Sequence, residues 1–251
     1  MKHVPLTIPE IGLIAGTRAA GGAIVTGGTG VCGDGIAQAL VLEGARVFIC
    51  GREEARLKTA LQALSVSAEG SVGGIVADVG LYPDCRKLVA AAVERFGGLD
   101  IRVHNAGVGH VYKPVDQISP EVWDTTIGTY LSGMFYCCRE AVPLMRKAGA
   151  GYIFNISSTA TIVLCPGGSA YNASKTGVSG LTETLVKDVR YDGIRVSEIV
   201  IGSVSTDDRG YERWKLAIED VVQVVIDLYK LPPRALVSRV ELWAAEPPPN
   251  R

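Results

Sequence analysis

From Ala23 to Trp243 the chain alternates short runs of β-branched and other apolar residues with longer segments of helical periodicity. This alternation is typical of βαβ units, in which each helix returns the chain so that the next strand joins the same parallel sheet. Most of the strand segments are continuously apolar, which indicates that both faces of the sheet are covered. The pattern predicts an α/β fold with one doubly wound parallel sheet and helices on both of its faces.

Seven strand segments are predicted, over residues 23–26, 45–50, 72–77, 101–104, 152–156, 195–200 and 236–240. The helical segments between them include residues 33–43, 83–96, 123–146, 173–191 and 219–229. Pro232 and Pro233 end the last helix, because proline lacks the N–H group that would extend it. No internal repeat or low-complexity linker divides the chain, so we expect an N-terminal arm over residues 1–22 and one domain over residues 23–251.

Charge and cysteine content exclude several classes of partner. The chain has 25 Lys and Arg against 26 Asp and Glu, so it lacks the basic field that attracts nucleic acid or an anionic membrane. The first 22 residues contain neither a signal-peptide pattern nor an apolar run that could span a membrane. The six cysteines lack the spacing of a metal site or a redox dithiol. We therefore expect a cytoplasmic protein without a metal that acts on a small molecule.

The segment from Ala23 to Gly33 runs from a strand through a glycine-rich turn into a helix. Glycines allow the backbone to approach a pyrophosphate, whose charge is stabilised by the free N–H groups at the start of the helix. A plain tight turn would use the same glycines, so the strand and helix on either side carry the prediction. The segment predicts a dinucleotide site of the Rossmann type, formed by Gly27, Thr29, Gly30, Val31, Cys32 and Gly33.

The end of the second strand indicates which dinucleotide binds. A carboxylate at this point usually holds the ribose 2′-hydroxyl of NAD, but here Gly51 is followed by Arg52. A guanidinium can hold a 2′-phosphate through two parallel hydrogen bonds, although a solvated arginine at a helix start is the alternative. We predict NADP(H) as the preferred cofactor, with NAD(H) possible. After the third strand, Asp78 either meets the adenine or caps the following turn, and Val79 is assigned to the same part of the site.

Tyr171 and Lys175 are four residues apart, which on a helix places a phenol and an ammonium on the same face. A phenol with a pKa of ~10 is a poor acid–base at neutral pH, and a neighbouring positive charge lowers that pKa. Ser158 follows a predicted strand, where its hydroxyl could hold a substrate oxygen beside Tyr171. A tyrosine and a lysine at this spacing are common by chance, so the pair alone does not establish an active site.

Taken together, these pieces resemble the short-chain dehydrogenase/reductase family over residues 23–242. The resemblance is carried by Thr26 and Gly27 with Gly33, by Asn105-Ala106-Gly107 after the fourth strand, and by Ser158, Tyr171 and Lys175. It implies a seven-stranded sheet in the order 3-2-1-4-5-6-7. It also implies an oxidoreductase, of the NADP(H)-preferring carbonyl reductase type, that reduces a ketone or aldehyde to an alcohol or performs the reverse reaction.

The resemblance assigns a role to each of these residues. Tyr171 would be the general acid–base and Ser158 would orient the carbonyl, while Lys175 would lower the pKa of the tyrosine and bind the nicotinamide ribose. Asn105, Ala106 and Gly107 would line the adenosine side, and the nicotinamide would be contacted by Gly202, Val204 and Thr206. Relatives pair two helices across a two-fold axis, which implies a homodimer or a homotetramer.

Three positions depart from the family pattern. Tyr130 stands where an asparagine usually bends the helix and supports a water-mediated proton relay from the lysine. Either its hydroxyl holds a water instead or Lys175 reaches solvent by another route. Val31 replaces a glycine of the phosphate turn, and the remaining glycines also fit the extended, sugar-nucleotide-modifying members of the family. Ile201 replaces the proline that usually precedes Gly202, which is expected to loosen that loop.

These departures keep two alternatives open: a sugar-nucleotide epimerase or dehydratase, and a cofactor-binding sensor or scaffold without turnover. Retention of Ser158, Tyr171 and Lys175 favours the oxidoreductase. Only a short stretch, residues 207–218, precedes the last helix, so an open pocket is expected. Its expected walls favour an apolar or aromatic substrate and are His110, Leu164, Pro166, Tyr211 and Trp214; His110 is interpreted as a loop residue rather than a catalyst.

Overall fold

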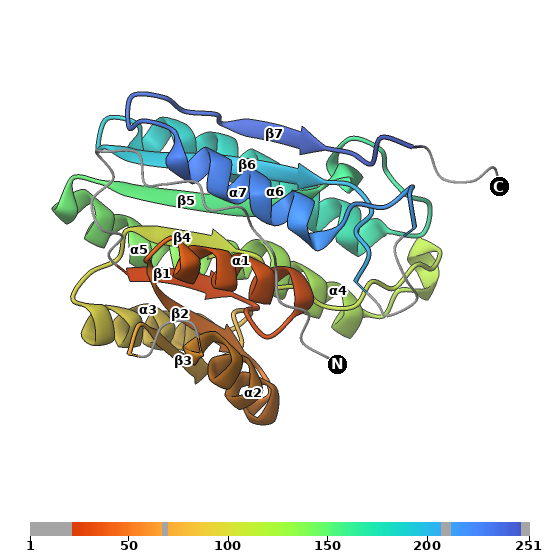
Figure 1. Cartoon of the computed structure of the whole chain (residues 1–251). Helices are drawn as coiled ribbons and strands as arrows, with labels where there is room; N and C mark the ends of the chain where they lie inside the picture. The colour runs from red at the N-terminus through yellow and green to blue at the C-terminus, as the bar shows by residue number, and fades with distance from the viewer. Residues whose placement is uncertain (1–21, 67–69, 207–211, 247–251) are drawn as a thin grey trace.

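The computed structural model describes residues 22–66, 70–206 and 212–246. Seven parallel strands form one sheet in the order β3-β2-β1-β4-β5-β6-β7, which confirms the predicted fold and strand order (Figure 1). The strands are β1 (Gly22–Thr26), β2 (Arg46–Gly51), β3 (Val72–Val76), β4 (Ile101–His104), β5 (Gly151–Ser158), β6 (Ile194–Ile201) and β7 (Arg239–Leu242). The N-terminal arm predicted over residues 1–22 lies outside the described residues, except for Gly22, which begins β1.

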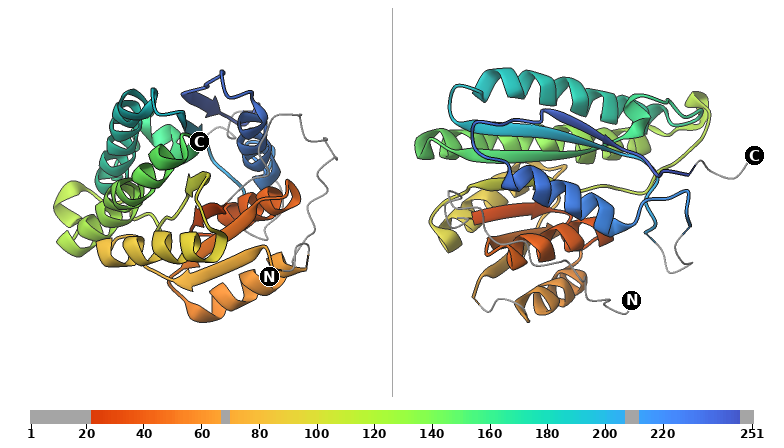
Figure 2. Two further views of the ribbon diagram at one scale, coloured as in Figure 1. Left: turned by 90° about the vertical axis from the view of Figure 1, so that its left-hand side faces the viewer. Right: turned by 45° about the horizontal axis from the view of Figure 1, so that its top comes forward.

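Helices cover both faces of the sheet, as Figure 2 shows from two sides. One core cluster of buried side chains includes residues of α1 (Val31–Leu42), α2 (Glu54–Ser65) and α7 (Ile218–Lys230). The other includes residues of α3 (Tyr82–Phe96), α5 (Gly133–Ala148) and α6 (Ser169–Val189). The short helix α4 (Pro120–Ile127) packs beside α6. Strands between these layers bury both faces in the middle of the sheet, whereas β3 and β7 at its edges are partly exposed.

Local sequence signals set several helix ends. Helix α4 begins after Ser119, whose hydroxyl accepts a hydrogen bond from the N–H of Val122 at 3.4 Å. Helices α3 and α5 end at Gly97 and Gly149, which adopt left-handed backbone conformations with φ of 77° and 66°. A left-handed residue that ends a helix is most often glycine, because other residues pay a steric cost there.

The segment predicted as one helix over residues 123–146 is interrupted. A π-helical turn, η2 (Gly128–Ser132), separates α4 from α5. A π turn leaves backbone groups without their normal helical partners, and here the carbonyl of Tyr130 is bonded to Nε2 of His104 at 2.9 Å. Helical periodicity could not predict this interruption, because the partner that holds it comes from β4.

Candidate active site

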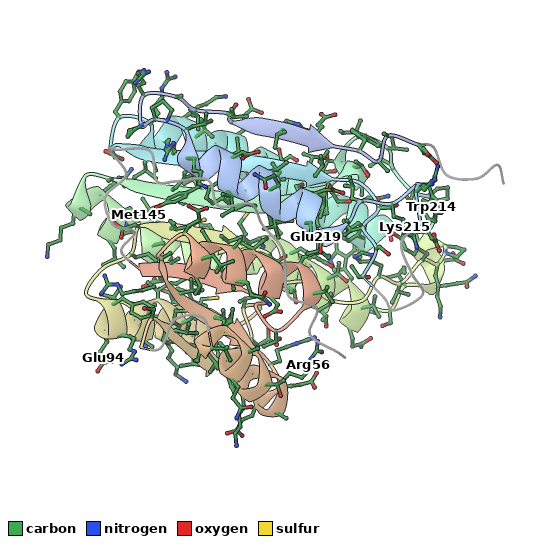
Figure 3. All side chains as sticks on the ribbon, in the orientation of Figure 1. Arg56, Glu94, Met145, Trp214, Lys215 and Glu219 are labelled. Carbon is green, nitrogen blue, oxygen red and sulfur yellow. The ribbon has the colours of Figure 1, made fainter. Side chains whose placement is uncertain are left out.

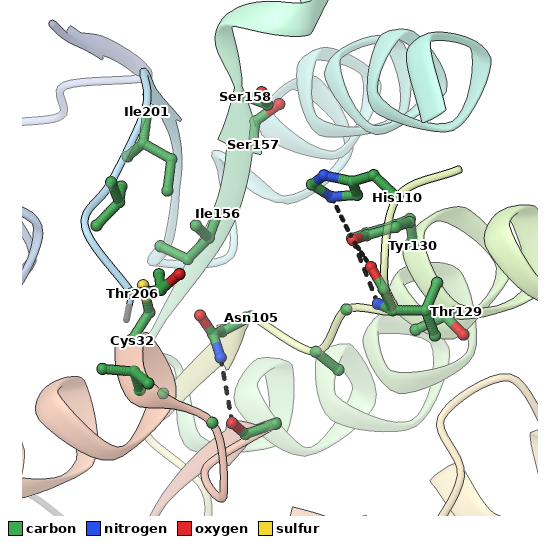
Figure 4. A pocket seen from close by; sticks show the side chains of 18 of the residues that line it. Cys32, Asn105, His110, Thr129, Tyr130, Ile156, Ser157, Ser158, Ile201 and Thr206 are labelled. Atoms are coloured by element: carbon green, nitrogen blue, oxygen red, sulfur yellow. Dashed lines mark hydrogen bonds between the residues drawn. The ribbon is translucent and has the colours of Figure 1, made fainter. Parts of the chain in front are cut away.

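A cleft of about 1520 Å³ opens at the carboxyl ends of the central strands. In doubly wound sheets this is the edge where ligands bind, because the loops that follow the strands diverge there. Every residue that the sequence assigned to catalysis or cofactor binding lines this cleft. Figure 4 shows part of it, with Cys32, Asn105 and Thr206 on one side and His110 with Tyr130 on the other.

The glycine turn between β1 and α1 forms a close-packed cradle. Gly27 has a φ of 67°, and a Cβ there would lie 2.8 Å from Cα of Ala106. A Cβ on Gly33 would overlap the carbonyl oxygen of Gly27 and lie 2.5 Å from Nδ2 of Asn105. No side chain caps the first turn of α1, so its N–H groups face the cleft without a competing side-chain acceptor. This cradle fits a pyrophosphate, which would accept hydrogen bonds from these N–H groups.

Thr26 and Asn105 hold the turn after β1 against the turn after β4. The hydroxyl of Thr26 donates to the carbonyl of Val103 at 3.2 Å and accepts from the backbone N–H groups of Asn105 and Ala106. The side-chain amide of Asn105 donates to the carbonyl of Thr26 at 3.1 Å. These bonds explain why the chain keeps a polar residue at each position: they fix the floor of the cleft before any ligand binds.

Two arginines lie at the end of the cleft next to the end of β2. Arg52 is exposed and lines the cleft directly after β2, as the sequence predicted. Arg56, on α2, was not predicted; its guanidinium donates to the carbonyl of Thr29 at 3.1 Å and pairs with Glu53 at 3.6 Å. In Figure 3, Arg56 is labelled beside α2, in the lower part of the molecule. Its position in the first turn of α2, soon after Arg52, is the signal that could have identified it.

Ser158, Tyr171 and Lys175 come together from β5 and α6. Ser158 is the last residue of β5, and its hydroxyl hydrogen bonds with the phenol of Tyr171. Tyr171 and Lys175 share one face of α6, with Nζ of Lys175 5.8 Å from the centroid of the tyrosine ring. Nζ donates its hydrogen bond to the carbonyl of Ile156 at 3.0 Å and lies 4.5 Å from the ring centroid of Tyr130.

Burial dominates the acidity of these groups. It raises the pKa of Tyr171 well above its usual value, and the hydrogen bond from Ser158 opposes this only in part. Burial also lowers the pKa of Lys175 to about 8, against the opposing charge of Glu198. The expected lowering of the tyrosine pKa by Lys175 is not found, because the buried ammonium is directed to the carbonyl of Ile156 and desolvation of the phenol is the larger effect.

Tyr130 occupies the π turn and supports the loop after β4. Its hydroxyl donates to the carbonyl of Val108 at 2.8 Å and accepts from the N–H of the same residue at 3.2 Å. A Cβ on Gly107 would lie 2.9 Å from this hydroxyl, so the glycine leaves the space that the phenol fills. Burial raises the pKa of Tyr130 to about 12, so it remains a phenol at neutral pH. Tyr130 therefore fixes a loop at this position.

A buried polar chain under the cleft holds this turn. The guanidinium of Arg102, which has no exposed surface, donates to Nδ1 of His104 at 3.2 Å and to Oδ1 of Asn155 at 3.5 Å. Burial and the positive charges of Arg102 and Lys175 hold the pKa of His104 well below its usual value. A neutral His104 accepts at Nδ1 and donates from Nε2 to the carbonyl of Tyr130 at 2.9 Å. The sequence analysis did not identify this support.

The loop after β6 is held at both ends despite Ile201. The N–H of Gly202 donates to the carbonyl of Leu242 at 2.9 Å. Ser205 and Ser203 exchange backbone hydrogen bonds with Leu216, each at 2.8 Å. The expected loosening is therefore not seen in the described part of this loop, because β7 and the segment before α7 supply the contacts.

The predicted walls are correct in part. His110 and Trp214 line the cleft, whereas Leu164 is 63% exposed and, like Pro166, does not line it; Tyr211 lies outside the described residues. Walls that the sequence did not predict include Tyr112, Val163, Cys165 and Trp243. These residues follow strands in loops without a recognisable period, so their direction is set by the fold.

In the described part of the chain, every helix is too short or too polar to span a membrane.

Most of this chain is similar to known proteins. A family model described as short chain dehydrogenase matches residues 22–215. Human dehydrogenase/reductase SDR family member 4 is 37% identical over 185 residues, which span 73% of this chain and 66%, just under two thirds, of the human protein. D-beta-hydroxybutyrate dehydrogenase of Rhizobium meliloti is 36% identical over 185 residues, or 73% of this chain and 71% of the relative.

A solved structure extends the similarity over most of the fold. A metagenomic short-chain oxidoreductase in complex with NADP superimposes with a TM-score of 0.79 at 30% sequence identity. The superposition covers 89% of this chain and 98% of that one.

Proposed function

Since the chain belongs to the short-chain dehydrogenase/reductase family, we propose that it is an NADP(H)-dependent oxidoreductase that reduces a ketone or aldehyde, or oxidises the corresponding alcohol. The observation that carries the proposal is the convergence of Ser158, Tyr171 and Lys175 on the cleft that contains the glycine cradle. When bound, the nicotinamide cofactor supplies the hydride chemistry. The residues of this chain would bind the cofactor, orient the carbonyl and protonate its oxygen.

In the proposed reduction, Ser158 and Tyr171 hold the carbonyl oxygen through hydrogen bonds. The raised pKa of Tyr171 keeps its phenol protonated at neutral pH, which is the state needed to protonate the oxygen as the carbonyl carbon becomes tetrahedral. The ammonium of Lys175 adds positive charge next to the developing phenolate. The cradle from Gly27 to Gly33 would hold the pyrophosphate, and Asn105 to Gly107 the adenosine side, with Gly202, Val204 and Thr206 toward the nicotinamide.

The walls around the reacting end favour an apolar or aromatic substrate. Tyr112, Val163 and Trp214 line the cleft, and its carboxylates among the described residues, Glu53 and Asp78, follow β2 and β3 rather than β5. A panel of an aromatic ketone, an aromatic aldehyde and an aromatic dione with NADPH tests the proposal. Oxidation of NADPH that is stoichiometric with alcohol formation is expected from at least one compound. NADPH binding without oxidation by any of them would instead favour the sensor, and turnover of a sugar nucleotide without net use of cofactor would favour the epimerase.

The proposed preference for NADP(H) predicts the effect of removing Arg52. Changing Arg52→Gln is expected to weaken NADPH binding about 10-fold, in line with the loss of a charge-assisted hydrogen bond. NADH binding should not change, because NADH lacks the 2′-phosphate. Titration of cofactor fluorescence with both nucleotides measures the two affinities. A parallel Arg56→Gln variant shows whether the second guanidinium shares the phosphate. Equal losses for NADPH and NADH in the Arg52 variant would refute the assignment.

The proposal includes self-association as a homodimer or a homotetramer. Trp123 on α4 and Phe135 on α5 remain 41% and 47% exposed, and large apolar side chains at a surface favour a protein interface. Light scattering coupled to size-exclusion chromatography measures the mass in solution, and a monomer at micromolar concentration would contradict this part of the proposal.

A further inference from the structure

His110 lies in the loop after β4 and packs on the proposed general acid–base. The centroids of its ring and the Tyr171 ring are 4.0 Å apart, with the ring planes inclined by 42°. Its Nε2 lies 3.1 Å from the hydroxyl of Tyr130, and Figure 4 shows the imidazole directed into the cleft with this bond drawn. His110 is only partly buried, so the ring that contacts Tyr171 also reaches solvent. These contacts go beyond the role of a loop residue.

The bonds of Tyr130 determine which nitrogen of His110 carries the proton. A phenol has one proton, and Tyr130 gives it to the carbonyl of Val108, which can only accept. The Tyr130 oxygen is then an acceptor, both for the N–H of Val108 and for Nε2 of His110. Nε2 of His110 must therefore be protonated, and in the neutral ring Nδ1 carries the lone pair. In the described part of the chain, no hydrogen bond occupies Nδ1, and none joins His110 directly to the hydroxyl of Tyr171, so the two rings pack without a direct proton bridge.

The groups that face His110 keep it neutral. Burial and the charge of Lys175 on α6 lower the pKa of His110 below its usual value. The other groups around it are phenols: Tyr112 from its own loop, Tyr130 from the π turn and Tyr171 from α6. No carboxylate contacts the ring among the described residues. At neutral pH the imidazole is therefore a base with an open Nδ1.

We propose that His110 is a second acid–base residue, which takes up the phenol proton of Tyr171 at Nδ1 through one water molecule in the cleft during alcohol oxidation and returns it by the same route during carbonyl reduction. This inference rests on the proposed function. In oxidation, the carbinol carbon loses a hydride to the nicotinamide of NADP⁺, so the alcohol is oxidised and the cofactor is reduced. The alcohol proton passes to the oxygen of Tyr171 as the phenol proton passes to the water and a proton of the water passes to Nδ1, and the imidazolium then releases a proton to solvent.

This role explains how a phenol with a raised pKa can act as a base. Tyr171 alone stays protonated at neutral pH, and Lys175 is engaged with the carbonyl of Ile156. An acceptor that reaches the phenol through one water removes the need to form a free phenolate. The proton then has a route from the buried Tyr171 to the exposed edge of His110.

The test uses variants that separate proton transfer from packing. His110→Gln keeps an N–H donor for Tyr130 but cannot take up a proton, and His110→Phe keeps the ring packing on Tyr171. Both are expected to lower kcat for the oxidation of 1-phenylethanol, benzyl alcohol or cyclohexanol by NADP⁺ about 10²-fold, a typical contribution of general acid–base catalysis. Adding free imidazole to the His110→Ala variant should restore part of the rate.

The pH profile distinguishes catalysis from a structural role. Because only neutral His110 accepts a proton, kcat for oxidation by the wild type should fall as pH drops through a pKa below about 6.5, the ordinary value for histidine. The Gln and Phe variants should lack this acidic limb. A Gln variant with the wild-type rate and the wild-type acidic limb would overturn the proposal and leave the proposed function intact.

A spectroscopic measurement tests the inference without turnover. Long-range ¹H–¹⁵N correlation spectra of the wild type at neutral pH should show His110 protonated at Nε2 alone, and the Tyr130→Phe variant should lose this bias. A wild-type His110 protonated at Nδ1 would overturn the proposal whatever the kinetics. If the wild type shows the Nε2 tautomer but oxidises no alcohol and reduces no carbonyl, the proposed function fails and the proton-transfer role fails with it.

Discussion

Replacing Tyr171 with Phe is expected to leave NADPH binding unchanged and to lower the rate of carbonyl reduction about 10²- to 10⁴-fold, the range of general acid–base catalysis. The variant removes only the hydroxyl that hydrogen bonds with Ser158, and the ring can keep its packing against His110. Steady-state rates and cofactor titration measure the two effects separately. A variant that reduces the carbonyl at the wild-type rate would refute the role of Tyr171.

A tyrosine that lies outside the cleft provides a matched control. Tyr191 follows α6, is 90% exposed and does not line the cleft. The Tyr191→Phe variant should retain wild-type kcat and KM. Reduction by the wild type should weaken only as pH rises through about 8, where Lys175 loses its charge, because the raised pKa of Tyr171 preserves the protonated phenol at neutral pH. Loss of reduction at neutral pH as the phenol ionises would contradict the assignment.

The second large effect is expected at the glycine cradle. Gly33→Ala should weaken NADPH binding at least about 10-fold and lower stability by about 1–3 kcal/mol, the usual cost of overpacking a close contact. The added Cβ would overlap the carbonyl oxygen of Gly27, which belongs to the backbone and cannot rotate away. The turn must therefore shift, and the first turn of α1 moves with it. Cofactor titration and thermal unfolding measure the two effects.

Gly180→Ala provides the control for this substitution. Gly180 lies in α6, and a Cβ there would meet nothing within 4 Å. Alanine in an open helical position should stabilise the protein by about 0.5–1 kcal/mol, because it restricts the unfolded chain more than glycine does. NADPH binding by the Gly180→Ala variant should not change. If Gly33→Ala bound NADPH as tightly as Gly180→Ala does, the cradle would not be the pyrophosphate site.

Much of this arrangement could be predicted from the sequence because the signals are local. The apolar strands and the helices between them gave the sheet and its two covering layers. The glycines from Gly27 to Gly33 are adjacent in the chain, so their turn depends little on the rest of the fold. Tyr171 and Lys175 lie one helical turn apart and meet the strand end at Ser158 in the expected way.

The features that the sequence did not predict depend on contacts between distant segments of the chain. The π turn at Tyr130 is held by His104 from β4, and His104 is oriented by the buried Arg102. His110 gains its position from Tyr130 and Tyr171, which come from two different helical segments. The acidity of Tyr171 was predicted in the wrong direction, because the spacing of Tyr171 and Lys175 shows their proximity but not how deeply the phenol is buried.

The transfer of a labelled hydride tests the central claim most directly. The enzyme would be incubated with a reactive carbonyl of the panel and NADPH that carries deuterium at the transferable position of the nicotinamide. We expect mass spectrometry to find one deuterium on the carbinol carbon of the product for each NADPH that the wild type oxidises, and about 10²- to 10⁴-fold less labelled product from Tyr171→Phe in the same time. Product alcohol without deuterium from either stereospecifically labelled form of NADPH, or equal amounts of labelled product from both proteins, would contradict the account.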